Sequence, residues 1–318
     1  MTDPTMTIEV LDARVKRREE RRDFFRNITG GAAALTAGAA FFSGTAVNAQ
    51  AVTVSDPDIL NFALNLEYLE AQFYSYAATG LGLPNSQLTG TGTQGTVIGG
   101  RKVNFTDRVV AAYAKEIAQD EVAHVAFLRS ALGSAAVASP SIDVGGSDPN
   151  GAFSSAARAA GLVGPGVAFD PYASDENFLL GAFIFEDVGV TAYKGAATLI
   201  SNKTYLEAAA GLLAVEAYHA SLVRTVLYGK GIATPSLRTS ADAISRARDS
   251  LDGPATEDQG ITGDSTTSNI VPLDSDGLAF SRTTGQVLNI VYLNKLAINK
   301  GGFFPNGVNG SINMSAAN

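Results

Sequence analysis

The two histidines of this 318-residue chain each lie three positions after a glutamate, and this spacing constrains the fold more than any other feature. The segments read Glu121-Val122-Ala123-His124 and Glu216-Ala217-Tyr218-His219. Positions i and i+3 share one face of a helix, so each pair can present a carboxylate oxygen and an imidazole nitrogen to the same point. Oxygen and imidazole ligands together suit iron, manganese or zinc. The spacing predicts that two helices each carry half of a metal site.

The composition narrows the chemistry and the partners. The chain contains no cysteine, which excludes disulfides, iron–sulfur clusters and thiolate zinc sites, so any metal must be held by oxygen and nitrogen. A net charge of −8, without basic clusters after the N-terminal region, argues against nucleic acid as a partner. The apolar content of 46% is that of a soluble globular protein with ample material for a core.

The N-terminal region carries the pattern of an export signal. Arg21-Arg22-Asp23-Phe24-Phe25-Arg26 precedes a weakly apolar run from Ile28 to Val47, and Val47-Asn48-Ala49 is an A-x-A-like cleavage site. The arrangement resembles a twin-arginine signal, with an uncleaved anchor or a basic tail as the alternative. We therefore expect residues 1–49 to be a signal peptide and the mature protein to be periplasmic or extracellular. The apolar run is too rich in Gly, Ser and Thr for a convincing membrane span, so no stable span is expected after signal removal.

Apolar residues recur at helical period in four segments of the mature chain. The predicted helices cover about residues 58–78, 106–132, 174–200 and 203–228. The connection over residues 80–105 is rich in Gly and Thr and predicts a loop or a small hairpin. A long crossover, residues 133–172, separates the second helix from the third. Four helices with one long crossover between two hairpins is the ferritin-like arrangement, so residues 50–230 are predicted to form an all-α four-helix bundle.

After residue 231 the chain becomes more polar and mostly irregular. Short helices are expected over residues 241–251 and 285–293, and the segment 301–307 predicts turns with two exposed or docked aromatic residues. Because the apolar content of this region is thin, we expect residues 231–318 to be a C-terminal extension packed on the bundle rather than an independent domain.

The first and third predicted helices carry a second repeated pattern. Glu67 is followed seven residues later by Tyr74, and Glu186 by Tyr193. Seven residues make two helical turns, so each tyrosine shares a face with its glutamate, and the whole motif order describes a duplicated helical hairpin. Both glutamates lie in apolar stretches where an unpaired carboxylate is costly to bury. Together with Glu121 and Glu216 they make four carboxylates, whose charge two divalent cations would balance. The tyrosines are either ordinary core residues or partners of the ligands.

Two assignments stay open when spacing is the only guide. Glu70 lies three residues from Glu67 on nearly the same face and is an alternative ligand, although Gly189 at the equivalent position of the third helix favours Glu67 by symmetry. Asp120 and Asp187 are candidates for orienting an imidazole from behind the ligands.

These motifs resemble the ferritin-like superfamily of di-iron and di-manganese carboxylate proteins, in particular its exported, desiccation-related branch. The resemblance covers about residues 53–312, and its specific part is the four helical motifs. It implies a centre of two iron or manganese ions in which Glu121 and Glu216 bridge. The ligands that it implies are Glu67, Glu121, His124, Glu186, Glu216 and His219.

The resemblance also implies a function. Centres of this kind perform redox chemistry with dioxygen or peroxide, and ferroxidase-like and catalase-like activities use the same ligands, so we expect an exported protein of stress protection whose enzymatic role is undecided. The alternative is a non-enzymatic protein that is stabilised by metal or sequesters iron and is linked to desiccation tolerance. Dioxygen or peroxide is the expected small-molecule partner, and a homo-oligomer is compatible with the pattern. The long first loop, the crossover and the C-terminal extension argue against a hollow storage shell.

Overall fold

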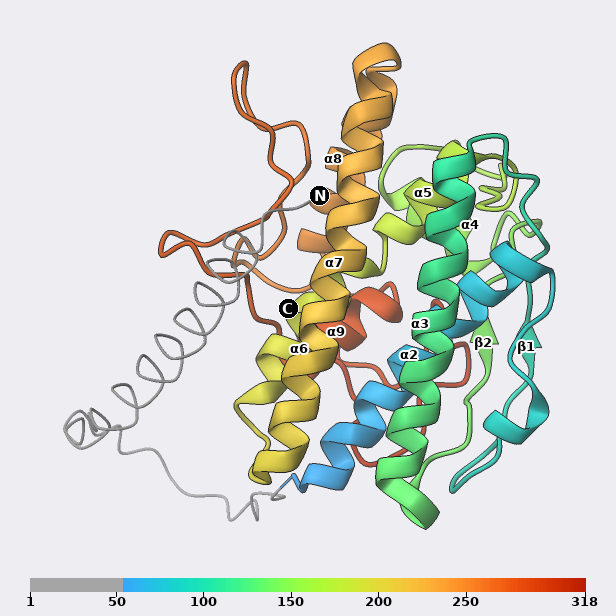
Figure 1. The fold of residues 1–318 in the computed structure, drawn as a ribbon, viewed down its shortest axis with the longest axis vertical. Coiled ribbons are helices and arrows are strands. Elements are labelled where there is room, and N and C mark those ends of the chain that lie inside the picture. The colour runs from blue at the N-terminus through green and yellow to red at the C-terminus, as the bar shows by residue number, and fades with distance from the viewer. Residues whose placement is uncertain (1–53) are drawn as a thin grey trace, which may run out of the picture. The chain divides into compact units, whose positions relative to one another are not determined.

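The computed structural model describes residues 54–318. The predicted signal peptide, residues 1–49, lies outside the described residues. Long helices make up the centre of the described part, and shorter helices, loops and two short strands lie around them (Figure 1). The all-α fold that the hydrophobic periodicity predicts is confirmed.

Two long helices, α2 (Asp56–Thr79) and α3 (Arg108–Leu132), form the first hairpin and pack along each other. The N-terminus of α2 is fixed by a capping box, in which the Ser55 and Asp58 side chains each accept a hydrogen bond from the other residue's backbone. The helix ends at Gly80, whose φ of 86° is a left-handed conformation that glycine adopts without strain. Because these local signals are encoded in the sequence, both helices end close to their predicted bounds.

The third predicted helix is two helices in the structure, α5 (Asp175–Phe183) and α6 (Glu186–Ala197). The prediction of one continuous helix over residues 174–200 was wrong at this junction. There the Phe185 N–H donates to the Ala182 carbonyl at 2.9 Å, the tighter i→i+3 pattern of a 3₁₀ turn. The break makes one of the predicted ligands the first residue of α6.

The second hairpin is completed by α7 (Lys203–Ala233), which packs mainly on α6. This helix runs past the predicted end at residue 228 and passes through Gly231, which lies against Arg238 of α8 (Ser236–Asp249). A Cβ at Gly231 would come within 2.3 Å of the Arg238 side chain, so close helix packing accounts for glycine inside a helix. Among the described residues, α7 is by length and composition apolar enough to cross a membrane.

The two long connections pair with each other rather than folding locally. Strand β1 (Val97–Ile98) of the first connection lies parallel to β2 (Ile142–Asp143) of the crossover, with Val97 opposite Ile142. The small hairpin considered for residues 80–105 is therefore wrong. The crossover also contains a helix that was not predicted, α4 (Ala152–Ala159), and single 3₁₀ turns occur at η1 (Asn85–Gln87) and η2 (Gly133–Ala135).

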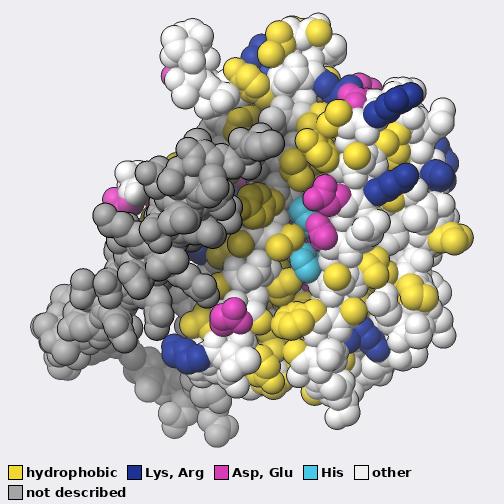
Figure 2. Space-filling model, viewed as in Figure 1, with side chains coloured by type: hydrophobic (Ala, Val, Ile, Leu, Met, Phe, Trp, Pro, Cys, Tyr) yellow, Lys and Arg dark blue, Asp and Glu magenta, His cyan; other side chains and the backbone are white. Residues whose placement is uncertain are grey.

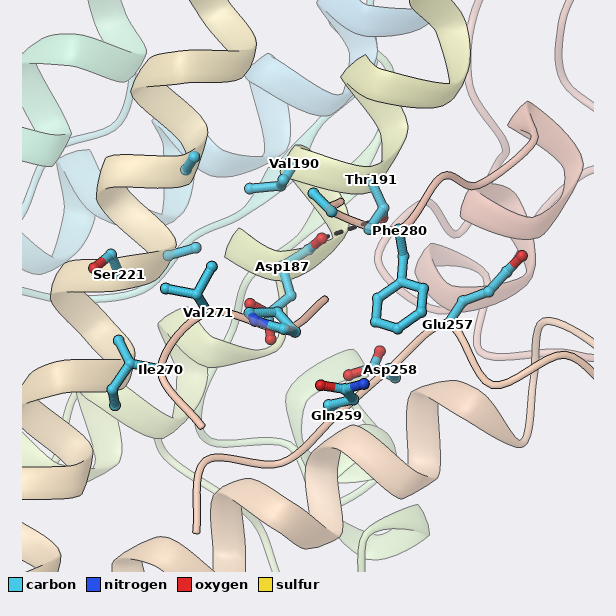
Figure 3. Close-up of a pocket in the computed structure, with 14 residues that line it drawn as sticks. Asp187, Val190, Thr191, Ser221, Glu257, Asp258, Gln259, Ile270, Val271 and Phe280 are labelled. Atoms are coloured by element: carbon cyan, nitrogen blue, oxygen red, sulfur yellow. Dashed lines mark hydrogen bonds between the residues drawn. The ribbon is translucent and has the colours of Figure 1, made fainter. Parts of the chain in front are cut away.

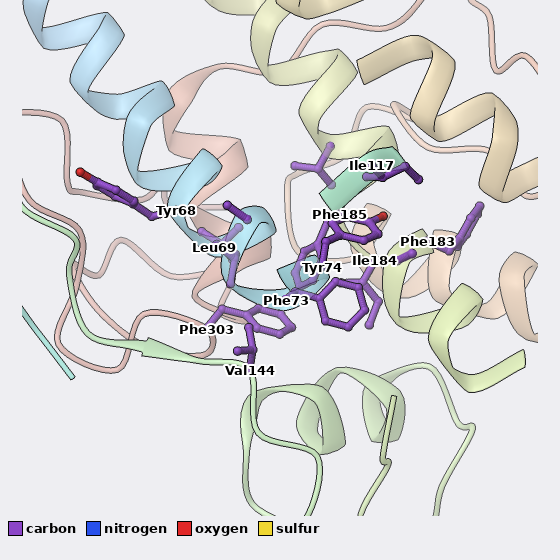
Figure 4. Close-up of a cluster of buried hydrophobic side chains, with 14 of the residues drawn as sticks. Tyr68, Leu69, Phe73, Tyr74, Ile117, Val144, Phe183, Ile184, Phe185 and Phe303 are labelled. Atoms are coloured by element: carbon purple, nitrogen blue, oxygen red, sulfur yellow. The ribbon is translucent and has the colours of Figure 1, made fainter. Parts of the chain in front are cut away.

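The C-terminal extension contributes to the same hydrophobic core as the bundle. It contains α8 and α9 (Thr284–Val291), and the rings of Phe303 and Phe304 are completely buried. The Phe303 ring lies 4.8 Å from that of Phe185 and 5.2 Å from that of Phe153, in an aromatic cluster between the extension, the helix break and the crossover (Figure 4). The extension therefore packs directly against the α5–α6 break.

Candidate metal centre

The six predicted ligands come together in the interior of the bundle, from α2, α3, α6 and α7. The four glutamates have exposed fractions between 0% and 2%, and the histidines are also buried. The residues are Glu67, Glu121, His124, Glu186, Glu216 and His219. Each hairpin supplies three of them, as the duplicated motif order predicts.

The ligand atoms form two overlapping groups, and within each group they lie within 4.8 Å of one another. One group consists of Glu67, Glu121, His124 and Glu216, and the other of Glu186, Glu216 and His219. Glu216 belongs to both groups. Glu121 also contacts both halves, because its two oxygens lie 3.6 Å from His124 Nδ1 and 3.1 Å from His219 Nδ1. These are the positions that two bridging carboxylates would need.

Both imidazoles turn the same nitrogen towards the carboxylates. His124 Nδ1 lies 3.2 Å from Glu67 Oε2, and His219 Nδ1 lies 3.8 Å from Glu186 Oε2. The other nitrogen of His219, Nε2, lies 3.1 Å from Asp120 Oδ2, a contact that fixes the orientation of the ring. The Asp120 side chain is 42% exposed, so this contact lies at an edge of the centre towards solvent. Figure 2 shows histidine and acidic side chains together at the surface where α3 and α7 face each other.

The repeated spacing, in which a tyrosine follows a glutamate by seven residues, produces a crossed pair of hydrogen bonds. Tyr74 of α2 donates to Glu186 of α6, and Tyr193 of α6 donates to Glu67 of α2. Burial, and then the nearby carboxylate charges, raise the pKa of both phenols well above their usual range, so both are neutral donors. Each tyrosine thus holds the carboxylate of the opposite hairpin, which spacing along one helix does not reveal.

Burial sets the charge state of the carboxylates. Burial and the charge of Glu121 raise the pKa of Glu67 to about 7, and burial raises that of Glu186 to about 8. Burial and the neighbouring carboxylates raise the pKa of Glu216 well above its usual range. Glu121 differs: burial disfavours its charge, but its close interactions with the imidazoles of both histidines outweigh this effect and lower its pKa to about 2.

The histidines carry the compensating charge. Burial disfavours the imidazolium form, but hydrogen bonds and attraction from the carboxylates outweigh it and raise the pKa of His124 to about 11 and that of His219 to about 9. The metal-free centre therefore binds protons strongly at neutral pH. A metal ion binds imidazole nitrogen and carboxylate oxygen only after protons leave, so metal and protons compete for the same atoms.

Several buried polar atoms of the centre lack a hydrogen-bond partner among the described residues. They are one oxygen each of Glu121 and Glu186, both oxygens of Glu216, and Nδ1 of His219. Buried polar atoms are nearly always paired, and leaving one unpaired costs about 1–3 kcal/mol. These atoms belong to predicted ligands that cluster around common points. Carboxylate oxygens and imidazole nitrogens suit iron and manganese, so the residues fit the ions that the motifs imply.

The structure separates Glu67 from its alternative, Glu70. Glu70 is buried, with an exposed fraction of 6%, but it belongs to neither group of clustered ligand atoms. It lines a small, mainly apolar cavity with Phe185 and Gly189. Burial and repulsion from the other carboxylates raise the pKa of Glu70 well above its usual range, so it is neutral in the metal-free centre.

Asp187 does not orient an imidazole, so this candidate role was wrong. Its Oδ2 instead accepts hydrogen bonds from Arg224 at 2.7 Å and from Arg248 of α8 at 2.8 Å. Sequence reasoning missed both arginines, because nothing in their spacing connects them to the metal motifs. Arg248 lies in the predicted C-terminal extension, residues 231–318, which was expected to pack on the bundle.

Comparisons with known proteins agree with this architecture. The family described as Ferritin-like domain matches residues 55–229, more than half of the chain. The chain is 29% identical over 280 residues to a ferritin-like catalase of Nesocodon mauritianus, a match that spans 82% of this chain and 86% of that protein. It is 30% identical over 246 residues to a desiccation-related protein of Craterostigma plantagineum, spanning 74% of this chain and 76% of that protein. With a bundle of the expected type and a buried carboxylate–histidine cluster at its centre, the chain belongs to the ferritin-like domain family.

Proposed function

We propose that this chain binds two iron or manganese ions between its helical hairpins and uses them for redox chemistry with peroxide or dioxygen in stress protection. The observation that carries the proposal is the cluster of buried carboxylate and imidazole groups from four helices, several of whose atoms have no hydrogen-bond partner among the described residues. The relative that is named a ferritin-like catalase makes peroxide the first substrate to test. A pair of such ions supplies two-electron redox chemistry with these oxidants.

The side chains of the centre have distinct tasks in this proposal. Glu67 and Glu186 would each hold one ion, and Glu121 and Glu216 lie where their carboxylates could reach both positions. Four carboxylates would balance the charge of two divalent ions, so the centre with both ions bound would be close to neutral. Tyr193 and its counterpart on α2 orient the Glu67 and Glu186 carboxylates through their hydrogen bonds.

A matched pair of glutamate variants on α3 tests the proposal. Glu121→Gln removes a bridging charge at nearly constant shape, whereas Glu116→Gln alters an exposed residue of the same helix. Elemental analysis of the full chain after loading with Mn²⁺ or Fe²⁺ should give about two ions for the wild type and for Glu116→Gln. Glu121→Gln should bind metal at least roughly tenfold more weakly and release proportionately less oxygen from hydrogen peroxide. A wild-type chain that retains no metal would sink the proposal.

A non-enzymatic role is the second candidate, and one feature of the centre favours it. The imidazole side chains of His124 and His219 are only 9% and 2% exposed, which restricts access to the ligands. The relative named a desiccation-related protein fits a metal-stabilised or iron-sequestering protein as well. This role predicts two bound ions but equal peroxide consumption by the wild type and Glu121→Gln. Export to the periplasm or the cell exterior belongs to both proposals.

A further inference from the structure

We propose that Arg248 of the C-terminal extension is a positioning residue for the Glu186 half of the metal centre. The inference rests on the proposed function, since it concerns how one of the two ion positions is built. It assigns the extension a task beyond covering the bundle. Without this arginine, the ion held by Glu186, Glu216 and His219 should bind more weakly than the ion on the α2–α3 side.

Arg248 binds the chain immediately before Glu186. One nitrogen of its guanidinium, Nη1, donates to the carbonyls of Phe183 and Ile184, the latter at 3.3 Å. These carbonyls lie at the break between α5 and α6, where the regular helical ladder is interrupted and backbone acceptors are left over. The guanidinium also lies over the Phe183 ring, 4.8 Å from its centroid. The arginine therefore stabilises the break that gives α6 its starting point.

Arg248 also binds the residue immediately after Glu186. Its second nitrogen, Nη2, donates to Asp187 Oδ2 at 2.8 Å and to Asp258 Oδ1 at 2.6 Å. One buried guanidinium thus holds the chain at positions 183–184 and at position 187, on both sides of the ligand. The Glu186 side chain points the other way, towards the centre, where Tyr74 donates to it.

The rest of the outer face of α6 is held by the same extension. Arg282 donates to the Thr191 hydroxyl at 3.0 Å, and Lys194 donates to the Ala279 carbonyl. At Gly195 a Cβ would lie 1.9 Å from the Arg282 carbonyl oxygen, so helix and extension are in direct backbone contact. Asp187 and Thr191 line a cavity together with residues of α7, such as Ser221, and of the extension, such as Asp258 and Phe280 (Figure 3). The outward positions of α6 bind the extension while the inward ones face the metal ligands.

Both aspartates that bind Arg248 also bind another arginine, so the loss of Arg248 need not unfold the protein. Asp187 is also bound by Arg224 at 2.7 Å, and Asp258 is also bound by Arg282 at 2.9 Å. Removing one buried charge normally leaves its partner unpaired, at a large cost. In a variant without Arg248, each aspartate keeps its second arginine. Only the hydrogen bonds to the Phe183 and Ile184 carbonyls are lost without replacement.

The experiment compares Arg248→Met with Arg246→Met in the full chain. Arg246 is exposed, lies on the same helix, and makes no side-chain hydrogen bond to the described residues. Mn²⁺ titration should show two ions bound by the wild type and by Arg246→Met. In Arg248→Met one ion should bind as in the wild type, and the other roughly 10- to 100-fold more weakly. At two Mn²⁺ per chain, the electron paramagnetic resonance signal should be that of a coupled pair in the wild type and that of an isolated bound ion in Arg248→Met.

Arg248→Lys provides the rescue test. It keeps the charge and can reach one of the two groups of acceptors but not both, because it lacks the planar fork of arginine, so it should recover part of the lost affinity. Two ions bound by Arg248→Met with wild-type affinities, or equal weakening at both positions, would overturn the inference while leaving the proposed function intact. A wild type that binds no Mn²⁺ or Fe²⁺ would overturn the proposed function itself.

Discussion

Glu216 presents two buried oxygens to the centre, and neither has a hydrogen-bond partner among the described residues. Such a carboxylate is stable only if it is protonated or if a cation lies beside it. The raised pKa of Glu216 describes the first state, and the neighbouring ligand atoms within 4.8 Å provide for the second. In the proposed metal centre, Glu216 would release its proton when a metal ion binds beside it.

Tyr193 offers a test at this scale. Tyr193→Phe removes the hydroxyl that donates to Glu67 and leaves a buried carboxylate oxygen without that donor. We expect the free energy of unfolding to fall by about 1–2 kcal/mol, with weaker metal binding. Urea unfolding and Mn²⁺ titration measure the two effects. Tyr113→Phe on α3 is the control, because Tyr113 is half-buried and its hydroxyl makes no hydrogen bond to the described residues. Equal behaviour of the two variants would contradict the assigned role of Tyr193.

At the scale of helices, the two hairpins repeat one motif but are not identical. Glu70 on α2 corresponds by spacing to Gly189 on α6. A Cβ at Gly189 would lie 2.2 Å from Glu216 Oε2, so the absence of a side chain lets this carboxylate approach the α6 backbone. The second hairpin therefore has glycine where the first has Glu70, because a side chain at position 189 would displace Glu216.

Gly189→Ala should therefore separate stability from metal binding. Alanine favours a helix over glycine by up to about 1 kcal/mol, so the metal-free protein should lose little stability. Glu216 must shift, and metal binding should weaken roughly tenfold. Gly211→Ala on α7, where a Cβ would meet nothing within 4 Å, should stabilise the protein and leave metal binding unchanged. Isothermal titration with Mn²⁺ and urea unfolding of both variants measure these effects; unaltered binding by Gly189→Ala would show that the contact is unimportant.

The helix boundaries show what local sequence can predict. The start of α2 is fixed by side chains three residues apart, and its end by a glycine with positive φ, so both follow from the sequence. The break before α6 has no such signal. It depends on Arg248, which is far away in the sequence and donates to the carbonyls of the break. A periodic apolar segment therefore predicted one helix where tertiary contacts make two.

At the scale of the whole molecule, the charge state of the centre couples metal to stability. In the metal-free protein the pKa of Glu67 and Glu186 rises from the ordinary 4.5 to about 7 and about 8. A group whose pKa is higher in the folded than in the unfolded protein stabilises the fold. This contribution is complete at pH values below the unfolded-state pKa and is lost as the pH rises through the folded-state pKa. The histidines act in the same direction, because their pKa rises from 6.5 to about 11 for His124 and to about 9 for His219. The pKa of Glu121 is lowered to about 2, so its contribution to stability is lost only as the pH falls below about 4.5.

The chelator-treated protein should accordingly be most stable near pH 5 and lose stability as the pH rises towards 8. The Mn²⁺-loaded protein should not show this loss, because the ions stabilise the same carboxylates once they are ionised. Urea unfolding at pH 5, 6.5 and 8, with chelator and with excess Mn²⁺, measures the effect. A metal-free protein that becomes more stable across this interval would contradict the charge state assigned to the centre.

The sequence by itself determined the kinds of ligand, their spacing and the duplicated hairpin, because one residue's place on a helix face follows from local periodicity. It could not decide between Glu67 and Glu70, since both lie near the same face and the choice depends on how α2 is rotated against its neighbours. The crossed tyrosine contacts, the break before Glu186 and the contribution of Arg248 were decided by the tertiary structure alone. Each of them joins segments that are distant in the chain, and only the packing of the folded protein brings such segments into contact.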